Sequence, residues 1–99
     1  MDIKEENHKI FLKIMQEAGN LRWSKYCLYG DSYKLFSVQG LAMRMNDKIQ
    51  RILNILQSEK DFEKIYPLNE SLRDSALDLA NYAIMFVMEY DDKKEVLVK

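Results

Sequence analysis

Two sets of charged and polar residues recur at helical spacing and together could recognise an anionic ligand. In the first set, Arg44, Lys48 and Arg51 follow one another at steps of four and three residues, which places three positive charges on one helix face. The second set, on a later segment, consists of Ser71, Asp74, Asp78 and Asn81. Arginine and lysine bind phosphate through charge-assisted hydrogen bonds, and carboxylates orient such cations or accept hydrogen bonds from a ribose. The two sets therefore indicate an anion or nucleotide site.

The same two sets also admit a purely structural interpretation. Aspartate and asparagine are unfavourable inside a helix unless a partner satisfies their polar groups. The positive set supplies such partners, so the two ridges could pair and only align two helices. The sequence by itself leaves both interpretations open, a ligand site and a structural seam.

A third group is the tetrapeptide Tyr29-Gly30-Asp31-Ser32. Glycine lets the backbone approach a ligand closely, while Asp31 and Ser32 offer hydrogen-bonding groups at an expected helix start. A turn that only caps a helix would have the same sequence. The tyrosines on either side of the glycine could fill a core or stack on a base.

The elements that must position these residues are indicated by the spacing of apolar side chains. The pattern predicts three helices, at about residues 2–18, 38–58 and 70–90. Gly19 and Asn20 are expected to end the first helix, and an aromatic connector is expected over residues 19–37. The third helix is apolar on most sides, as a buried helix is. We therefore predict an all-α fold, a single small three-helix domain, which forms a helical-bundle homo-oligomer because two partner helices cannot cover the third.

Composition and charge exclude several other classes of protein. The chain has 99 residues, of which 47% are hydrophobic, with only three glycines and one proline, so a folded helical domain is expected rather than a disordered chain. The net charge of -1 gives no strong signal for nucleic-acid or membrane-surface binding. We expect a cytoplasmic protein, because Cys27 is the single cysteine and no apolar signal or membrane-spanning run is visible.

Three stretches, in their order and spacing, resemble the nucleotide modification associated domain family, first type. They are Tyr29-Gly30-Asp31-Ser32, LAMRMNDKIQR at residues 41–51 and ESLRDSALDLANYA at residues 70–83. Members are small helical proteins of bacteriophages and their hosts. The family name reflects an inferred link to nucleotide or DNA-base modification, and the resemblance implies the same link for this chain. The candidate ligand-binding residues that the resemblance marks are Tyr29, Gly30, Asp31, Ser32, Arg44, Lys48, Arg51, Asp74, Asp78, Asn81 and Tyr82.

A weaker likeness is to the all-α nucleoside triphosphate pyrophosphatases of the MazG type. Their third helix carries an acidic pair that helps to hold magnesium, and Asp74 and Asp78 are similar to that pair. Those enzymes also need a cluster of glutamates on the preceding helix, where this chain has two arginines, a lysine and only Asp47. Because magnesium requires oxygen ligands, this substitution argues against the enzyme.

The leading hypothesis is a non-catalytic, phage-type nucleotide-binding protein that acts as a sponge. It would sequester a signalling nucleotide of host antiviral defence, cyclic or linear, in the bacterial cytoplasm, with no metal or other cofactor and no catalytic residue. One alternative is a magnesium-dependent nucleoside triphosphate pyrophosphatase-like enzyme. Another is an accessory subunit in nucleotide or DNA-base modification, in which the polar seam only aligns helices.

Overall fold

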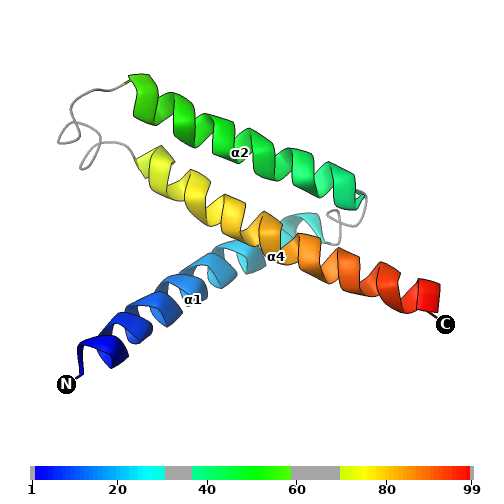
Figure 1. Ribbon diagram of the computed structural model, residues 1–99, viewed down its shortest axis with the longest axis horizontal. Coiled ribbons are helices and arrows are strands. Elements are labelled where there is room, and N and C mark those ends of the chain that lie inside the picture. The colour runs from blue at the N-terminus through cyan, green and yellow to red at the C-terminus, as the bar shows by residue number, and fades with distance from the viewer. Residues whose placement is uncertain (1, 31–36, 59–69, 99) are drawn as a thin grey trace. The chain divides into compact units, whose positions relative to one another are not determined.

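The computed structural model describes residues 2–30, 37–58 and 70–98, and Figure 1 shows the helices that these ranges form. The helices are α1 (Ile3–Tyr29), α2 (Val38–Ser58) and α4 (Glu70–Val98). No strand occurs in the described ranges, which confirms the predicted all-α class. Within the same ranges, no helix is long and apolar enough to cross a lipid bilayer.

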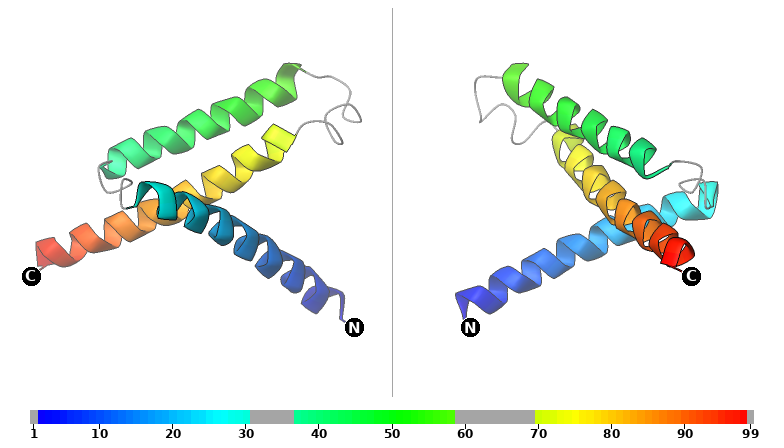
Figure 2. Two further views of the ribbon diagram at one scale, coloured as in Figure 1. Left: turned by 180° about the vertical axis from the view of Figure 1, so that it is seen from behind. Right: turned by 45° about the vertical axis from the view of Figure 1, so that its right-hand side comes forward.

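The chain divides into two compact units, residues 1–31 with α1 and residues 32–99 with α2 and α4. In the second unit, α2 and α4 lie side by side and run in opposite directions, as Figures 1 and 2 both show. The end of α2 lies near the start of α4, so the two helices form an antiparallel hairpin. This hairpin brings one residue of the positive set, Lys48, into contact with one residue of the acidic set, Asp78.

The start of α1 is stabilised by its own acidic residues. The Asp2 carboxylate accepts a hydrogen bond from the backbone N–H of Lys4 at 3.1 Å, which is an N-cap contact. Glu5 and Glu6 follow in the first turn, where negative charge interacts favourably with the helix dipole. The predicted start of this helix is therefore confirmed.

The predicted end of the first helix was wrong, because α1 continues through Gly19 and Asn20 to Tyr29. Glycine inside a helix costs only about 1 kcal/mol relative to alanine, so one glycine does not end a long helix. Asn20 is held within the helix, since its side-chain oxygen accepts from Gln16 Nε2 at 2.9 Å and its carbonyl accepts from Ser24 Oγ at 3.2 Å. Residues 19–29 of the expected connector are thus helical, and residues 31–36 lie outside the described ranges.

The predicted bounds of the second helix are confirmed, since α2 spans Val38–Ser58. Ser37 caps it: Ser37 Oγ accepts a hydrogen bond from the Gly40 N–H at 3.1 Å. The third helix begins at Glu70 as predicted but continues to Val98 rather than ending near residue 90. Residues 91–98 contain no glycine or proline, so nothing in their backbone chemistry stops the helix.

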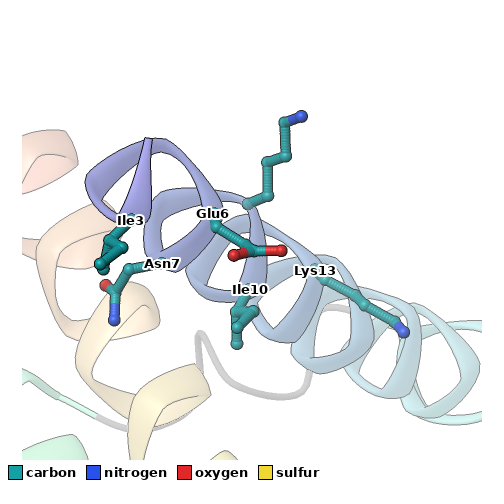
Figure 3. A pocket seen from close by; sticks show the side chains of 6 residues that line it. Ile3, Glu6, Asn7, Ile10 and Lys13 are labelled. Carbon is teal, nitrogen blue, oxygen red and sulfur yellow. The ribbon is translucent and has the colours of Figure 1, made fainter. Parts of the chain in front are cut away.

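Few apolar side chains in the described ranges are buried. Ala18, Leu41 and Leu77 are the hydrophobic residues with exposed fractions below a tenth. Within a single chain, the later turns of α4 are not fully covered, since Ile84 and Val87 are half exposed. On α1, a hollow is bordered by exposed side chains that include Ile3 and Ile10 (Figure 3). Much apolar surface therefore faces solvent.

Gly19 within α1 and Gly30 at its C-terminal cap should respond in opposite ways to alanine. Gly19 has open space where a β-carbon would lie, so Gly19→Ala should raise the free energy of unfolding by about 0.5–1 kcal/mol. Gly30 caps the helix at φ 61° and ψ -140°, a region reserved almost entirely for glycine, so Gly30→Ala should lower that free energy by about 1–3 kcal/mol. Urea unfolding followed by circular dichroism measures both changes, and equal effects of the two variants would contradict the assignment of Gly30 as the cap.

Candidate functional site

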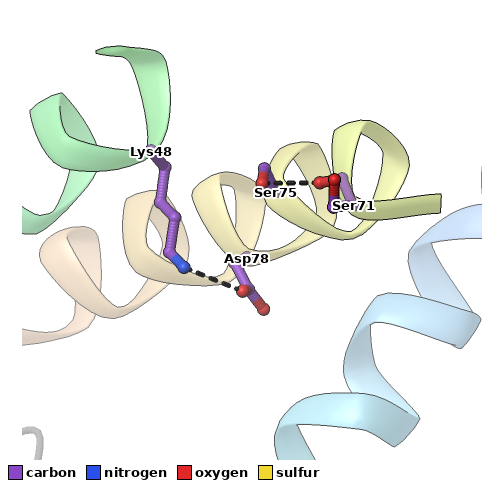
Figure 4. Close-up of polar contacts among 4 residues, drawn as sticks. All are labelled: Lys48, Ser71, Ser75 and Asp78. Atoms are coloured by element: carbon purple, nitrogen blue, oxygen red, sulfur yellow. Dashed lines mark hydrogen bonds and ion pairs between the residues drawn. The ribbon is translucent and has the colours of Figure 1, made fainter. Parts of the chain in front are cut away.

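An ion pair joins the two helices of the hairpin. Lys48 Nζ of α2 lies 3.2 Å from Asp78 Oδ2 of α4, as Figure 4 shows. The two side chains are only 24% and 18% exposed, so solvent and salt screen this pair less than a pair at the surface. The pair confirms that the positive ridge of α2 and the acidic ridge of α4 meet at this position.

This ion pair also sets the register of the antiparallel hairpin. From this contact and the antiparallel direction of the helices, helical spacing predicts that Arg44, one turn before Lys48, stands at the level of Asn81 and Tyr82. The same spacing predicts that Arg51, one turn after Lys48, stands at the level of Asp74. Both arginines and Asp74 are exposed, Tyr82 is half-buried and Asn81 is buried. We call these residues, with the ion pair, the α2–α4 seam; it has a shielded middle and exposed charges at both ends.

Two serines of α4 behave differently from the charged residues. Ser75 is 3% exposed, and its hydroxyl donates a hydrogen bond to the backbone carbonyl of Ser71 at 2.6 Å (Figure 4). This bond satisfies the Ser75 hydroxyl within its own helix. Ser75 is therefore a packing residue. The side chains of α4 that could contact a ligand are its charged and amide groups.

The sequence analysis did not single out Glu89, which is only 7% exposed on α4. No fully buried side-chain nitrogen or oxygen atom of the described residues lacks a hydrogen-bond partner. A charged residue between the apolar Met88 and the aromatic Tyr90 was the only available signal of an unusual environment.

The tetrapeptide of residues 29–32 is described only in part. Tyr29 is the last residue of α1, and Gly30 ends the helix with its N–H donating to the Tyr26 carbonyl at 2.6 Å. Asp31 and Ser32 lie outside the described ranges. The end of the helix accounts for the conformation of Gly30. For this residue, a role in capping a helix therefore explains the motif without a ligand.

The acidic residues of the seam bear on metal binding. Over residues 2–30, 37–58 and 70–98, no group of three or more His, Cys, Asp or Glu side chains is arranged to hold a metal ion. The Asp78 carboxylate instead lies against the Lys48 ammonium group, and the neighbouring positions on α2 carry arginines. These positive charges oppose the approach of a cation and favour that of an anion.

No family model, curated protein or solved structure matches the chain. The likeness to the nucleotide modification associated domain family therefore stays a hypothesis supported by its three sequence motifs. A proposal about function has to stand on the α2–α4 seam, where described residues of both helices meet.

Proposed function

We propose that the chain is a phage-type nucleotide-binding protein that captures a signalling nucleotide of host antiviral defence without altering it. The observation that supports this proposal is the half-buried ion pair between Lys48 and Asp78, which has an exposed arginine one turn away on either side. An anchored lysine between two arginines offers a phosphate-bearing ligand three donors along one helix face.

The spacing of the two arginines suits a ligand with more than one phosphate oxygen to bind. Arg44 and Arg51 are seven residues apart, which is about 10 Å along a helix. Their long side chains can converge on a polyphosphate or on a cyclic phosphodiester that lies over the middle of the seam. Guanidinium groups bind such oxygens through two parallel hydrogen bonds, so they add orientation as well as affinity.

The α4 side of the seam would hold the rest of the nucleotide. The Asp78 carboxylate fixes the lysine ammonium across the helix interface, so less side-chain entropy is lost when phosphate binds. Asp74 is exposed and can accept a hydrogen bond from a ribose hydroxyl, and Tyr82 is half-buried with a ring that can pack on a base. A nucleotide thus finds a complementary group for each of its parts.

The same residues favour capture over hydrolysis. Cleavage of a phosphoanhydride requires a group that offsets charge on the transferred phosphoryl and a water oriented for attack. The Asp78 carboxylate is engaged by Lys48 and is therefore poorly placed to activate a water or to ligate magnesium. The positive residues of α2 would stabilise a bound phosphate in its ground state as much as in a transition state, which gives affinity without rate.

The test is recovery of intact ligand. Purified protein is incubated with magnesium and one of two nucleotide sources. The first is a mixture of ATP, cyclic AMP and a cyclic dinucleotide, and the second is a lysate of defence-activated bacteria. After gel filtration and heat denaturation, chromatography should show one unaltered nucleotide in stoichiometric amount. Turnover that Asp78→Asn abolishes would instead establish the pyrophosphatase-like enzyme. Retention of no nucleotide from either source would contradict the proposal and favour the accessory subunit.

A further inference from the structure

The first half of α1 is exposed along its entire length. Every residue from 2 to 17 is exposed, and this stretch contains six large hydrophobic side chains: Ile3, Ile10, Phe11, Leu12, Ile14 and Met15. Further exposed hydrophobic residues on α1 are Trp23 and Leu28, so α1 has more of them than α2 or α4 among the described residues. Contiguous apolar surface of this kind marks an interaction site.

Part of this surface forms a hollow with both apolar and charged borders. Ile3 and Ile10 are two turns apart on one face, and Glu6 and Lys13 lie beside them, as Figure 3 shows. The hollow has a volume of about 400 Å³, and all of its described lining residues belong to α1. Two apolar residues bordered by one acidic residue and two lysines suit an amphipathic helix of the same pattern.

When two copies of this segment run antiparallel, charges of one copy face opposite charges of the other. The start of the helix is net negative, because Asp2, Glu5 and Glu6 outnumber Lys4, and the basic residues Lys9 and Lys13 follow. In an antiparallel pair, the acidic end of one helix faces the lysines of the other, and the two helix dipoles also oppose each other favourably. A parallel pair would instead place like charges side by side.

We propose that the first half of α1, residues 3–15, docks in an antiparallel arrangement on the same segment of a second copy of this chain. This surface lies on a different unit from the α2–α4 seam, and its pairing does not depend on nucleotide binding. The sequence alone had indicated the helix at 70–90 as the element that drives self-association.

The first test compares two isoleucines of similar exposure. Ile10 on α1 is 56% exposed and Ile84 on α4 is 50% exposed, so lysine at either position should leave the helices folded. Light scattering of the full chain should report twice 11.8 kDa for the wild type and a single chain for Ile10→Lys at micromolar concentration. Circular dichroism checks that the variants keep their helices.

The second test exchanges charges. Glu6 and Lys13 are seven residues apart, about 10 Å along the helix, so they do not pair directly within one chain but can do so between antiparallel copies. Glu6→Lys and Lys13→Glu should each raise the dissociation constant of the dimer by about fivefold, and the double variant should restore it.

The outcomes distinguish a dimer interface on α1 from one on α4 and from no dimer at all. Loss of the dimer in Ile10→Lys, with or without loss in Ile84→Lys, together with rescue by the double charge exchange, supports the proposal. A single-chain mass for the wild type at all concentrations would overturn it and leave another protein or another part of this chain as the occupant. Loss of the dimer only in Ile84→Lys, or no rescue in the double variant, would overturn it as well.

Discussion

Leu41→Ala is expected to unfold a large part of the α2–α4 hairpin. Leu41 is 0% exposed and is the most completely buried large side chain among the described residues. Replacement of a buried leucine by alanine costs about 2–5 kcal/mol, because transfer free energy is lost and a cavity remains. A small domain has only about 5–15 kcal/mol of stability in total, so this one change removes a large share of it.

The matched control is Leu53→Ala in the same helix. Leu53 is 40% exposed, so its truncation should cost about 1 kcal/mol or less, with a similar change in helix propensity. Thermal unfolding at a fixed protein concentration, followed by circular dichroism, should show a melting temperature lower by about 10–25 °C for Leu41→Ala and by a few degrees for the control. Equal shifts would mean that the burial of Leu41 adds no more to stability than an exposed leucine does.

The bounds of α2 could be predicted from the sequence because the apolar period of residues 41–56 is a local signal. The contact between Lys48 and Asp78 was one of two interpretations that the sequence left open. The first helix was misjudged at Gly19 because a helix stop depends on the residues after the glycine as well as on the glycine itself. Here those residues are compatible with a helix, and Gln16 and Ser24 both bond to Asn20.

Burial was harder to predict than secondary structure. Periodicity shows which face of a helix is apolar, but it does not show whether another element covers that face. The stripes of α1 and α4 have the same period, yet Phe11 is 59% exposed while Leu77 is 8% exposed. The burial of Ser75 and Glu89 was missed for the same reason, since only packing between elements determines it.

Arg51→Ala is expected to weaken nucleotide binding by about 10- to 150-fold. A charge-assisted arginine–phosphate contact contributes about 1.5–3 kcal/mol, and each 1.4 kcal/mol is a tenfold change in affinity. Arg44→Ala should have an effect in the same range, because both arginines are exposed and lie one turn from Lys48. Titration calorimetry with the nucleotide recovered from the wild-type protein measures the loss.

The control for net charge is Lys94→Ala, which removes one positive charge from an exposed position on α4. Lys94 lies sixteen residues beyond Asp78, about 24 Å along the helix, so its loss should change the affinity less than twofold at physiological salt. Arg51→Lys supplies a second comparison. It keeps the charge but removes the paired donors of the guanidinium, so its affinity should fall between those of Arg51→Ala and the wild type.

The two interpretations of the seam differ in which property each variant changes. An exposed arginine that binds ligand can be removed with a change of about 0.5 kcal/mol or less in the free energy of unfolding. Asp78→Asn should lower both stability and affinity, because Lys48 then loses its partner in a half-buried position. Unchanged affinity of Arg51→Ala together with a lower melting temperature would show that the seam only aligns α2 and α4. Reduced affinity at unchanged melting temperature would show that the positive face of α2 acts on a ligand, while the ion pair beside it carries the packing of the hairpin.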